Sequence, residues 1–341
     1  MQRIQRLVSR IESSELLDRL GERLDPLVRP LQSVPAVNDA LTGRWLGHSV
    51  HPMLVALPIG CWSSAALLDV AGSADAARRL TGAGVALAAP TALTGSADWL
   101  DTSGAERRVG VAHAVLNDVA VGAFGLSWLA RRRGRRATGM VLGGAGLAAM
   151  GAAGYLGGHL AYVRGVGVNT TAFQSGPDQW TRLVRADELT VDRAAEHHLD
   201  GLALLVVRTG DDEVRVLEDR CTHRGGSLSG GELVDGCVEC PWHASRFALD
   251  DGAVRHGPAS VPQPSYEVRL IDGWVEVRRP EQGGLRRNPV GAHADAAMAS
   301  AEPVAFEDLT RRQLYDRARE LDVEGRSRMT KAELVQALRD R

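Results

Sequence analysis

The sequence predicts a multidomain protein: an all-α bundle of four transmembrane helices, then an all-β domain, then a small two-helix module. Its 341 residues correspond to two or three domains at about 100–200 residues per domain. Most long apolar runs lie between residues 52 and 160, whereas short alternating β-branched runs begin near residue 180. These observations separate a helical part of the chain from a β part.

The predicted domain boundaries follow changes in composition along the chain. Stretches rich in Gly, Pro and Ala mark two linkers between segments with regular hydrophobic patterns. The predicted order is an amphipathic N-terminal segment at 1–47, a four-span transmembrane bundle at 48–165, a linker at 166–177, an all-β domain at 178–280, a linker at 281–304 and a two-helix module at 305–341.

Charge and cysteine content exclude two classes of protein. The chain has 40 basic and 42 acidic residues, so its net charge of −2 indicates no general affinity for nucleic acids or other polyanions. Four cysteines are too few for a disulfide scaffold. Three of them fall between residues 221 and 240, where a local cluster favours metal binding.

The N-terminal segment predicts an amphipathic helix, because apolar residues from Ile4 to Leu20 recur near helical spacing with Arg and Glu between them. Such a helix lies either on a membrane surface or against the rest of the protein. Residues 1–50 lack a central apolar run, so we expect no cleavable signal peptide.

Four apolar windows follow, at about 52–71, 80–99, 109–130 and 138–160. Each is near the ~20 residues that cross the hydrocarbon core of a bilayer. Each is also rich in Ala and Gly and contains polar residues, so a soluble helical bundle is the alternative. The regular spacing of the windows favours a membrane bundle.

Short runs such as Leu202 to Arg208, Val214 to Leu217 and Trp274 to Val277 predict strands of the all-β domain. The tail carries two capping-box patterns, Thr310 with Gln313 and Thr330 with Glu333, and each predicts the start of a short helix.

Two short motifs in the β domain contain residues that bind metals. Cys221-Thr-His223 is followed, after sixteen intervening residues, by Cys240-Pro-Trp-His243. Two thiolates and two imidazoles are the ligands of a 2Fe-2S cluster in which His replaces Cys on one iron. A mononuclear zinc site is the alternative. Cys237, three residues before Cys240, is expected to pack in the core.

The whole β segment resembles the Rieske 2Fe-2S domain family, in its ferredoxin-like branch. The resemblance rests on Trp180, on the Cys221 to Gly231 run, on the Cys240 to His243 box and on Gly257-Pro258-Ala259. It implies that Cys221 and Cys240 bind one iron and that His223 and His243 bind the other. It also implies that Pro258 lies in a loop over the cluster, and that Trp242 stands near the position of a cysteine that forms a disulfide in respiratory relatives.

The same resemblance leads to an expected reduction potential. In high-potential Rieske proteins, a serine and a tyrosine after the second loop donate hydroxyl hydrogen bonds to the cluster. Here Ser245 retains one donor, whereas Phe247 cannot supply the other. We therefore expect an intermediate potential within about −150 to +300 mV. Phe247→Tyr should raise it and Ser245→Ala should lower it, as a redox titration would measure.

Rieske domains also occur in ring-hydroxylating oxygenases, in which a second domain binds mononuclear iron through two His and a carboxylate. Only 61 residues follow residue 280, and His293 is their sole histidine. The chain is therefore not expected to be such an oxygenase, and the cluster is expected to pass electrons.

Alternating helix directions would place six polar residues at the end of the bundle that faces the β domain. They are His48, His51, Asp98, His113, Asn117 and His159. Polar groups inside a membrane are functional-site candidates, here for a haem, another metal or a quinone. Interfacial histidines in contact with water are the alternative. We expect at least two of the four histidines to meet in one site near the cluster.

Two further resemblances concern the ends of the chain. Arg44 to His48, His51 to Gly60, Gly110 to His113 and Tyr155 to Leu160 resemble a bacterial four-helix membrane family of unknown function, domain of unknown function 2231. Leu309 to Leu338 resembles the N-terminal module of transcription terminator Rho and SAP-like modules, which implies nucleic-acid binding. The net charge of residues 305–341 is only +1, so the electrostatic attraction of this module for nucleic acid is weak. A structural or protein-docking role is the alternative.

Together these patterns predict a multi-pass protein of a bacterial cell membrane that transfers electrons with a redox partner protein or a quinone. The alternatives are a redox sensor that relays the state of the cluster to the tail, and a plain membrane anchor for a ferredoxin. Near the apolar windows, four Arg lie on the side of the β domain and seven on the other. The positive-inside rule therefore favours an extracytoplasmic β domain, although a tail with cytoplasmic relatives argues against it.

Overall fold

The structure is a computed structural model that describes residues 2–210, 213–280 and 329–339. The chain divides into two compact units, Met1–Glu281 and Gln282–Arg341. The second predicted linker and the Thr310 cap lie outside the described residues. The redox-sensor alternative needs that linker to relay the state of the cluster to the tail, so the described residues do not test it.

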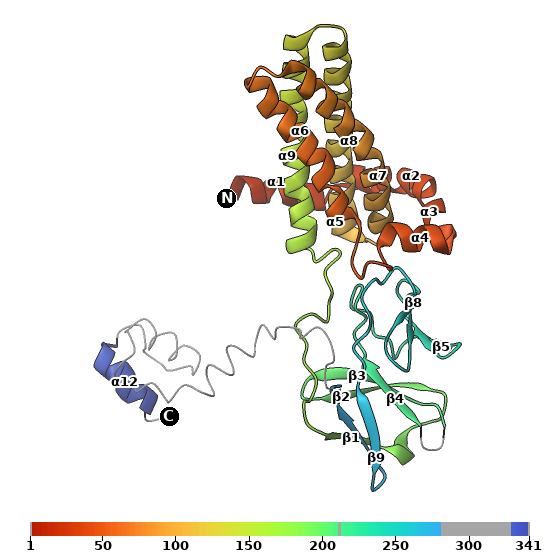
Figure 1. The fold of residues 1–341 in the computed structure, drawn as a ribbon. Coiled ribbons are helices and arrows are strands. Elements are labelled where there is room, and N and C mark those ends of the chain that lie inside the picture. The colour runs from red at the N-terminus through yellow and green to blue at the C-terminus, as the bar shows by residue number, and fades with distance from the viewer. Residues whose placement is uncertain (1, 211–212, 281–328, 340–341) are drawn as a thin grey trace. The chain divides into compact units, whose positions relative to one another are not determined.

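The chain begins with four helices: α1 (Gln2–Glu12), α2 (Glu15–Val28), α3 (Pro30–Ser33) and α4 (Pro35–Thr42). Figure 1 shows α1 and α2 running across the long helices that follow. Val8 of α1 is buried against Val109 and Leu156 of those helices, so one face of the predicted amphipathic helix packs on the protein. Ile4 and Leu7 of α1 and Leu16 of α2 remain exposed.

Ion pairs also attach the N-terminal helices to the bundle. Arg107 pairs with Asp25 at 3.0 Å, and Arg108 binds both carboxylate oxygens of Asp18. Arg164 pairs with Glu12 at 2.5 Å and lowers the pKa of that carboxyl by donating a hydrogen bond. Three arginines on the side of the β domain are thus neutralised by acidic residues of the N-terminal segment.

All four apolar windows are helical. The helices are α5 (His51–Leu54), α6 (Ala56–Val70), α7 (Ala74–Leu100), α8 (Gly104–Arg132) and α9 (Arg136–Tyr162). Among the described residues, three helical stretches are long and apolar enough to cross a membrane: His51–Val70, Gly104–Arg132 and Arg136–Tyr162. The polar content of α7 excludes it from that set, so the four-span bundle stays a prediction.

Small residues let the bundle helices approach closely. Trp62 of α6 stacks on Phe124 of α8 with ring centroids 4.2 Å apart, and the indole fills the space that a side chain at Gly84 would need. Farther along α8, Arg131 forms two hydrogen bonds of 2.7 and 2.6 Å with Asp69, and both side chains are buried. This charge pair satisfies two groups that would be costly to bury alone.

The β domain contains three antiparallel sheets, with strand orders β1-β10-β9, β2-β3-β4 and β5-β6-β7-β8. The strands are β1 (Thr181–Arg185), β2 (Ala194–Leu199), β3 (Leu202–Arg208), β4 (Val214–Glu218), β5 (Glu232–Val234), β6 (Cys237–Glu239), β7 (Arg246–Ala248), β8 (Val254–His256), β9 (Glu267–Ile271) and β10 (Trp274–Arg278). The three strands predicted from sequence correspond to β3, β4 and β10.

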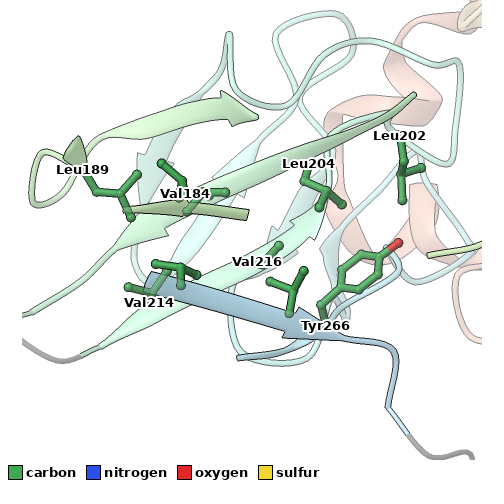
Figure 2. Close-up of a cluster of buried hydrophobic side chains, with 10 residues drawn as sticks. Val184, Leu189, Leu202, Leu204, Val214, Val216 and Tyr266 are labelled. Carbon is green, nitrogen blue, oxygen red and sulfur yellow. The ribbon is translucent and has the colours of Figure 1, made fainter. Parts of the chain in front are cut away.

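The first core of this domain lies between the two three-stranded sheets. Figure 2 shows Val184 of β1, Leu204 of β3 and Val216 of β4 grouped with Tyr266, which stands just before β9. A second core joins the other face of β3 to the four-stranded sheet, and it contains Cys221, Cys240 and Phe247. The two loops with metal-binding residues therefore start from a packed base.

In the second unit, the described residues form helix α12 (Lys331–Arg339). The Thr330 N–H donates to Glu333 Oε2 at 2.7 Å, and the Glu333 N–H donates to Thr330 Oγ1 at 3.3 Å. This confirms the predicted capping box at Thr330.

Candidate metal centre

Two loops with the same backbone hydrogen bonds carry the four candidate ligands. The Cys221 N–H donates to the Gly226 carbonyl at 2.9 Å, and the Cys240 N–H donates to Ser245 at 2.8 Å. In each loop the residue four positions after the cysteine, Gly225 or Ala244, donates back to the cysteine carbonyl and has a positive φ. The first loop lies between β4 and β5, and the second between β6 and β7.

This turn directs backbone N–H groups at each cysteine sulfur. His223 and Arg224 donate to Cys221, and the corresponding residues of the second loop, Trp242 and His243, donate to Cys240. Such donors stabilise negative charge on sulfur. The backbone donors of both loops therefore favour the thiolate form, which is the form that binds iron.

The four side chains converge in two pairs. The thiols of Cys221 and Cys240 are hydrogen-bonded to each other, and no disulfide joins them. The rings of His223 and His243 lie 5.1 Å apart between centroids at an angle of 86°. Two imidazoles that bind one tetrahedral ion with metal–nitrogen distances of ~2.0–2.1 Å have centroids about 5 Å apart.

The histidine nitrogens show that the residues fit a metal centre. Nδ1 of His223 and Nδ1 of His243 are both buried and have no hydrogen-bond partner among the described residues. Unpaired buried polar atoms are costly, and they are rare unless a metal or another ligand satisfies them. Both atoms could therefore bind one iron of a 2Fe-2S cluster.

The protonation states of His223 and Cys240 also favour metal binding. Burial, with the nearby His243 ring, lowers the pKa of His223 to about 3, so its imidazole is neutral and has a free lone pair. The hydrogen bond from Cys221, with the backbone donors, lowers the pKa of Cys240 to about 6. The same thiol pair raises the pKa of Cys221, because that sulfur donates the shared proton.

The arrangement agrees better with a binuclear cluster than with mononuclear zinc. A structural zinc ion needs four donors around one point. In the part of the chain that the structure describes, no three His, Cys, Asp or Glu side chains are grouped to hold one ion. A 2Fe-2S cluster requires only two protein donors per iron, because bridging sulfides complete each iron.

The four residues predicted to surround the cluster lie at different depths. Ser245 is fully buried, and its Oγ accepts a hydrogen bond from the Ala259 N–H at 3.0 Å, which links the second loop to the proline loop. Phe247 is also fully buried, in the core that contains both cysteines. Pro258 lines a cavity beside His223. Trp242 is 61% exposed and packs over Gly226.

One buried amide that sequence reasoning missed holds the first loop in place. Gln263 Nε2 donates to the carbonyls of Glu218 and Arg220 at 2.6 and 2.7 Å, and Oε1 accepts from the Thr222 N–H at 3.1 Å. In the sequence, Gln263 stands between two prolines and resembles an ordinary loop residue. Its role depends on a distant segment folding beside it.

Gln263→Leu should lower the free energy of unfolding of the β domain by about 2–4 kcal/mol, because it removes three hydrogen bonds and leaves buried backbone groups unpaired. Denaturant unfolding of the purified protein, followed by loss of cluster absorbance, measures this. Gln179→Leu, at an exposed position, is the control. Equal midpoints for the two variants would refute the role of Gln263.

The predicted linker at 166–177 is packed on the first loop. The Thr170 N–H donates to the Thr222 carbonyl at 3.1 Å, and Thr170 Oγ1 donates to the Cys221 carbonyl at 2.7 Å. Thr171 is fully buried. This segment therefore contributes to the site, beyond joining two domains.

Residues of the helical part face His223. Nε2 of His223 lies 3.8 Å from Asp101 Oδ2, at the end of α7, and Arg224 forms an ion pair with Glu106 in the first turn of α8. Burial raises the pKa of Asp101 to about 6. A cavity of about 50 Å³ lies here, and its lining includes Ser49, Asp98, Asp101, His223, Pro258 and Ser260.

The six polar residues predicted at this end of the bundle do not form one group. His51 and His113 lie 6.5 Å apart between ring centroids, and Asn117 Nδ2 is 3.0 Å from His113 Nε2. His48 is exposed and His159 binds Glu12 at 2.9 Å. Asp98 accepts a hydrogen bond from Ser49. Two of the four histidines therefore meet, and the other two lie elsewhere.

Comparison with known proteins assigns both parts of the chain. Residues 179–267 match the Rieske [2Fe-2S] domain, and residues 47–170 match a predicted membrane protein family, DUF2231. The anthranilate 1,2-dioxygenase ferredoxin subunit of Burkholderia cepacia is 37% identical over 99 residues, which cover 29% of this chain and 91% of that protein.

Two other relatives are also small ferredoxins. Ferredoxin CarAc of Metapseudomonas resinovorans is 32% identical over 98 residues, which cover 29% of this chain and 92% of that protein. The solved ferredoxin of carbazole 1,9a-dioxygenase from Nocardioides aromaticivorans is 27% identical and has a TM-score of 0.29, with coverage of 30% of this chain and 99% of that one. Through residues 179–267, this chain belongs to the Rieske [2Fe-2S] domain family and carries a 2Fe-2S cluster.

Proposed function

We propose that the protein is a membrane-anchored electron carrier in which Cys221 and Cys240 hold one iron of the 2Fe-2S cluster and His223 and His243 hold the other. The observation that carries this proposal is the pair of buried, unpartnered Nδ1 atoms beside two hydrogen-bonded thiols. The cluster stores and releases one electron when bound. The related ferredoxin subunits support electron transfer as the role.

The chain's own residues prepare this electron transfer. Backbone N–H groups of both loops stabilise charge on the two sulfurs, and the second core excludes water from the cysteine side. Ser245 keeps the proline loop against the second loop through Ala259. Rigid loops and the exclusion of water reduce the movement of protein groups and solvent when the cluster gains or loses an electron. Electron transfer is therefore easier.

The two histidines support two routes for the electron. His243 lies next to the exposed Trp242, where a soluble redox protein could approach. His223 faces Asp101 and the helices, where a haem, a metal or a quinone in the bundle would exchange electrons.

Electron exchange can be tested in the full-length protein placed in lipid nanodiscs. Protein reduced with dithionite, and freed of excess reductant, is mixed rapidly with oxidised cytochrome c or with a water-soluble quinone analogue. We expect the oxidised cluster spectrum to return within seconds with at least one acceptor. Trp242→Ala should slow only the reaction with cytochrome c. Failure of both acceptors to oxidise the cluster would contradict the proposal.

The membrane part is proposed to anchor the protein in a bacterial cell membrane, with the Rieske domain on the extracytoplasmic side. Three apolar helices support the anchor. The side follows from the arginine count, and the ion pairs of Arg107, Arg108 and Arg164 with N-terminal acidic residues lower the positive charge on the Rieske side further.

Ser103→Cys in whole cells should react with a membrane-impermeant maleimide, because this residue is exposed in the loop before α8. Arg133→Cys, in the loop between α8 and α9, is the matched control and should be protected until the membrane is opened. Labelling of only the second variant would place the Rieske domain in the cytoplasm.

A further inference from the structure

His51 and His113 form a pair that the cluster does not use. His51 begins α5 and His113 lies in α8, so distant segments bring the two rings to a centroid distance of 6.5 Å. His113 lies nine residues from the start of α8, about 13 Å at ~1.5 Å per residue. The His51 ring packs against Gly95, five residues before the end of α7. Both side chains are partly buried.

Each ring has one nitrogen fixed by a backbone carbonyl of a neighbouring helix. Nδ1 of His51 lies 3.0 Å from the Thr91 carbonyl in α7, and Nδ1 of His113 lies 2.8 Å from the Ala153 carbonyl in α9. A carbonyl only accepts, so each Nδ1 carries the proton. Each Nε2 therefore presents a lone pair, which is the arrangement found in metal-binding histidines.

Glycines on these two neighbouring helices make room for the rings. A Cβ at Gly95 of α7 would lie 2.7 Å from His51 Cε1, and one at Gly157 of α9 would lie 3.1 Å from His113 Cε1. Both distances are shorter than ordinary contacts. Each imidazole is therefore held both by close packing on a glycine and by the hydrogen bond at its Nδ1.

The spacing of the rings agrees with one ion bound between them. With metal–nitrogen distances of ~2.0–2.1 Å, two imidazoles on opposite sides of an ion have centroids about 6.3 Å apart. Asn117 Nδ2 now donates to His113 Nε2 at 3.0 Å, and it also donates to the His113 carbonyl at 3.0 Å. The amide therefore keeps a partner when the ring nitrogen binds an ion.

The number of donors selects the ion. Zinc takes four ligands, and the described residues provide no third His, Cys, Asp or Glu at the pair. Copper(I) has a filled d shell, binds imidazole and accepts two opposed ligands.

We propose that His51 and His113 bind one copper(I) ion in the membrane bundle. The inference extends the proposed electron-transfer function by naming the redox group of the bundle, but copper binding is measured without any electron transfer.

The test uses full-length protein in detergent, with its cluster intact. Copper(I) is titrated anaerobically in competition with the chelator bicinchoninate. We expect one tightly bound copper(I) per chain in the wild type and at least a ~100-fold weaker affinity in His51→Gln and in His113→Gln. X-ray absorption of the copper should show two nitrogen neighbours and no sulfur. The matched controls His48→Gln and His159→Gln should bind copper as the wild type does.

Iron content and cluster absorbance show whether each variant is folded. If the His51 and His113 variants keep the cluster and also keep the copper, or if sulfur neighbours appear, the copper is bound to cysteines and the inference is wrong. Haem in the purified protein, or zinc binding in preference to copper, would also overturn it. Copper bound as expected, in a protein whose reduced cluster is oxidised by neither cytochrome c nor the quinone analogue, would refute the proposed function and leave the copper site standing.

Discussion

Cys240→Ala is expected to yield protein without its 2Fe-2S cluster, so that iron falls from about two atoms per chain to near zero. Cys240 is buried beside Cys221 and receives backbone hydrogen bonds from Trp242 and His243. Alanine provides no ligand there, and three remaining donors cannot hold both irons. Iron analysis, visible absorbance and EPR of the purified variant measure the loss.

Cys237→Ala is the matched control, because this thiol lies three residues earlier on β6 and is also buried. Its Sγ is 3.8 Å from the Asp235 carbonyl, and burial raises its pKa. It should retain two irons per chain. Iron retained in Cys240→Ala, or lost in Cys237→Ala with the domain still folded, would refute the ligand assignment.

Asp101→Asn is expected to raise the midpoint potential of the cluster by about 50–100 mV at pH 8. The carboxylate lies 3.8 Å from His223 Nε2, and its negative charge disfavours the addition of an electron. At ~8 Å from the iron and an effective dielectric constant of ~20, one charge contributes roughly 2 kcal/mol, or about 90 mV for one electron.

The effect should depend on pH in a defined direction. Burial raises the pKa of Asp101 to about 6, so the carboxyl is ionised at pH 8 and largely neutral at pH 5. The wild type and the Asn variant should therefore differ at pH 8 and have nearly the same potential at pH 5. Spectroelectrochemical titration at the two pH values measures both differences.

Asp75→Asn tests whether the effect is local, because Asp75 lies at the other end of α7, about 37 Å from the end that precedes Asp101 at ~1.5 Å per residue. Asp75 is ionised at both pH values, since the Arg78 hydrogen bond lowers its pKa. This variant should leave the potential unchanged. A shift equal to that of Asp101→Asn, or no shift in Asp101→Asn, would show that the helical part does not tune the cluster.

Local patterns were sufficient to predict the elements of both parts. The β-branched runs became β3, β4 and β10, and the Thr330 capping box begins α12, because strand alternation and helix capping depend on residues close in sequence. The helices in the four apolar windows follow from composition in the same way. Membrane crossing by α7 remains a prediction, since its polar residues lower its mean hydropathy.

The candidate ligands could also be found in the sequence, because each pair lies within one short loop and needs only that loop's turn. Cys221 and His223 are two residues apart, and Cys240 and His243 are three apart. Gln263 and Thr170 were missed for the opposite reason. Their hydrogen bonds reach the first loop from segments more than forty residues away, and no local pattern marks them.

The sequence by itself therefore determined the helical and β parts, the two motif loops and the group of residues suited to an iron-sulfur cluster. Only the tertiary structure decided that His51 meets His113 while His48 and His159 lie elsewhere, and that Asp101 faces His223. Helix direction places a residue near one end of a bundle, but the rotation of each helix decides which side chain meets which. That rotation is set by packing, through contacts such as those of Gly95 and Gly157, which involve residues far apart in the chain.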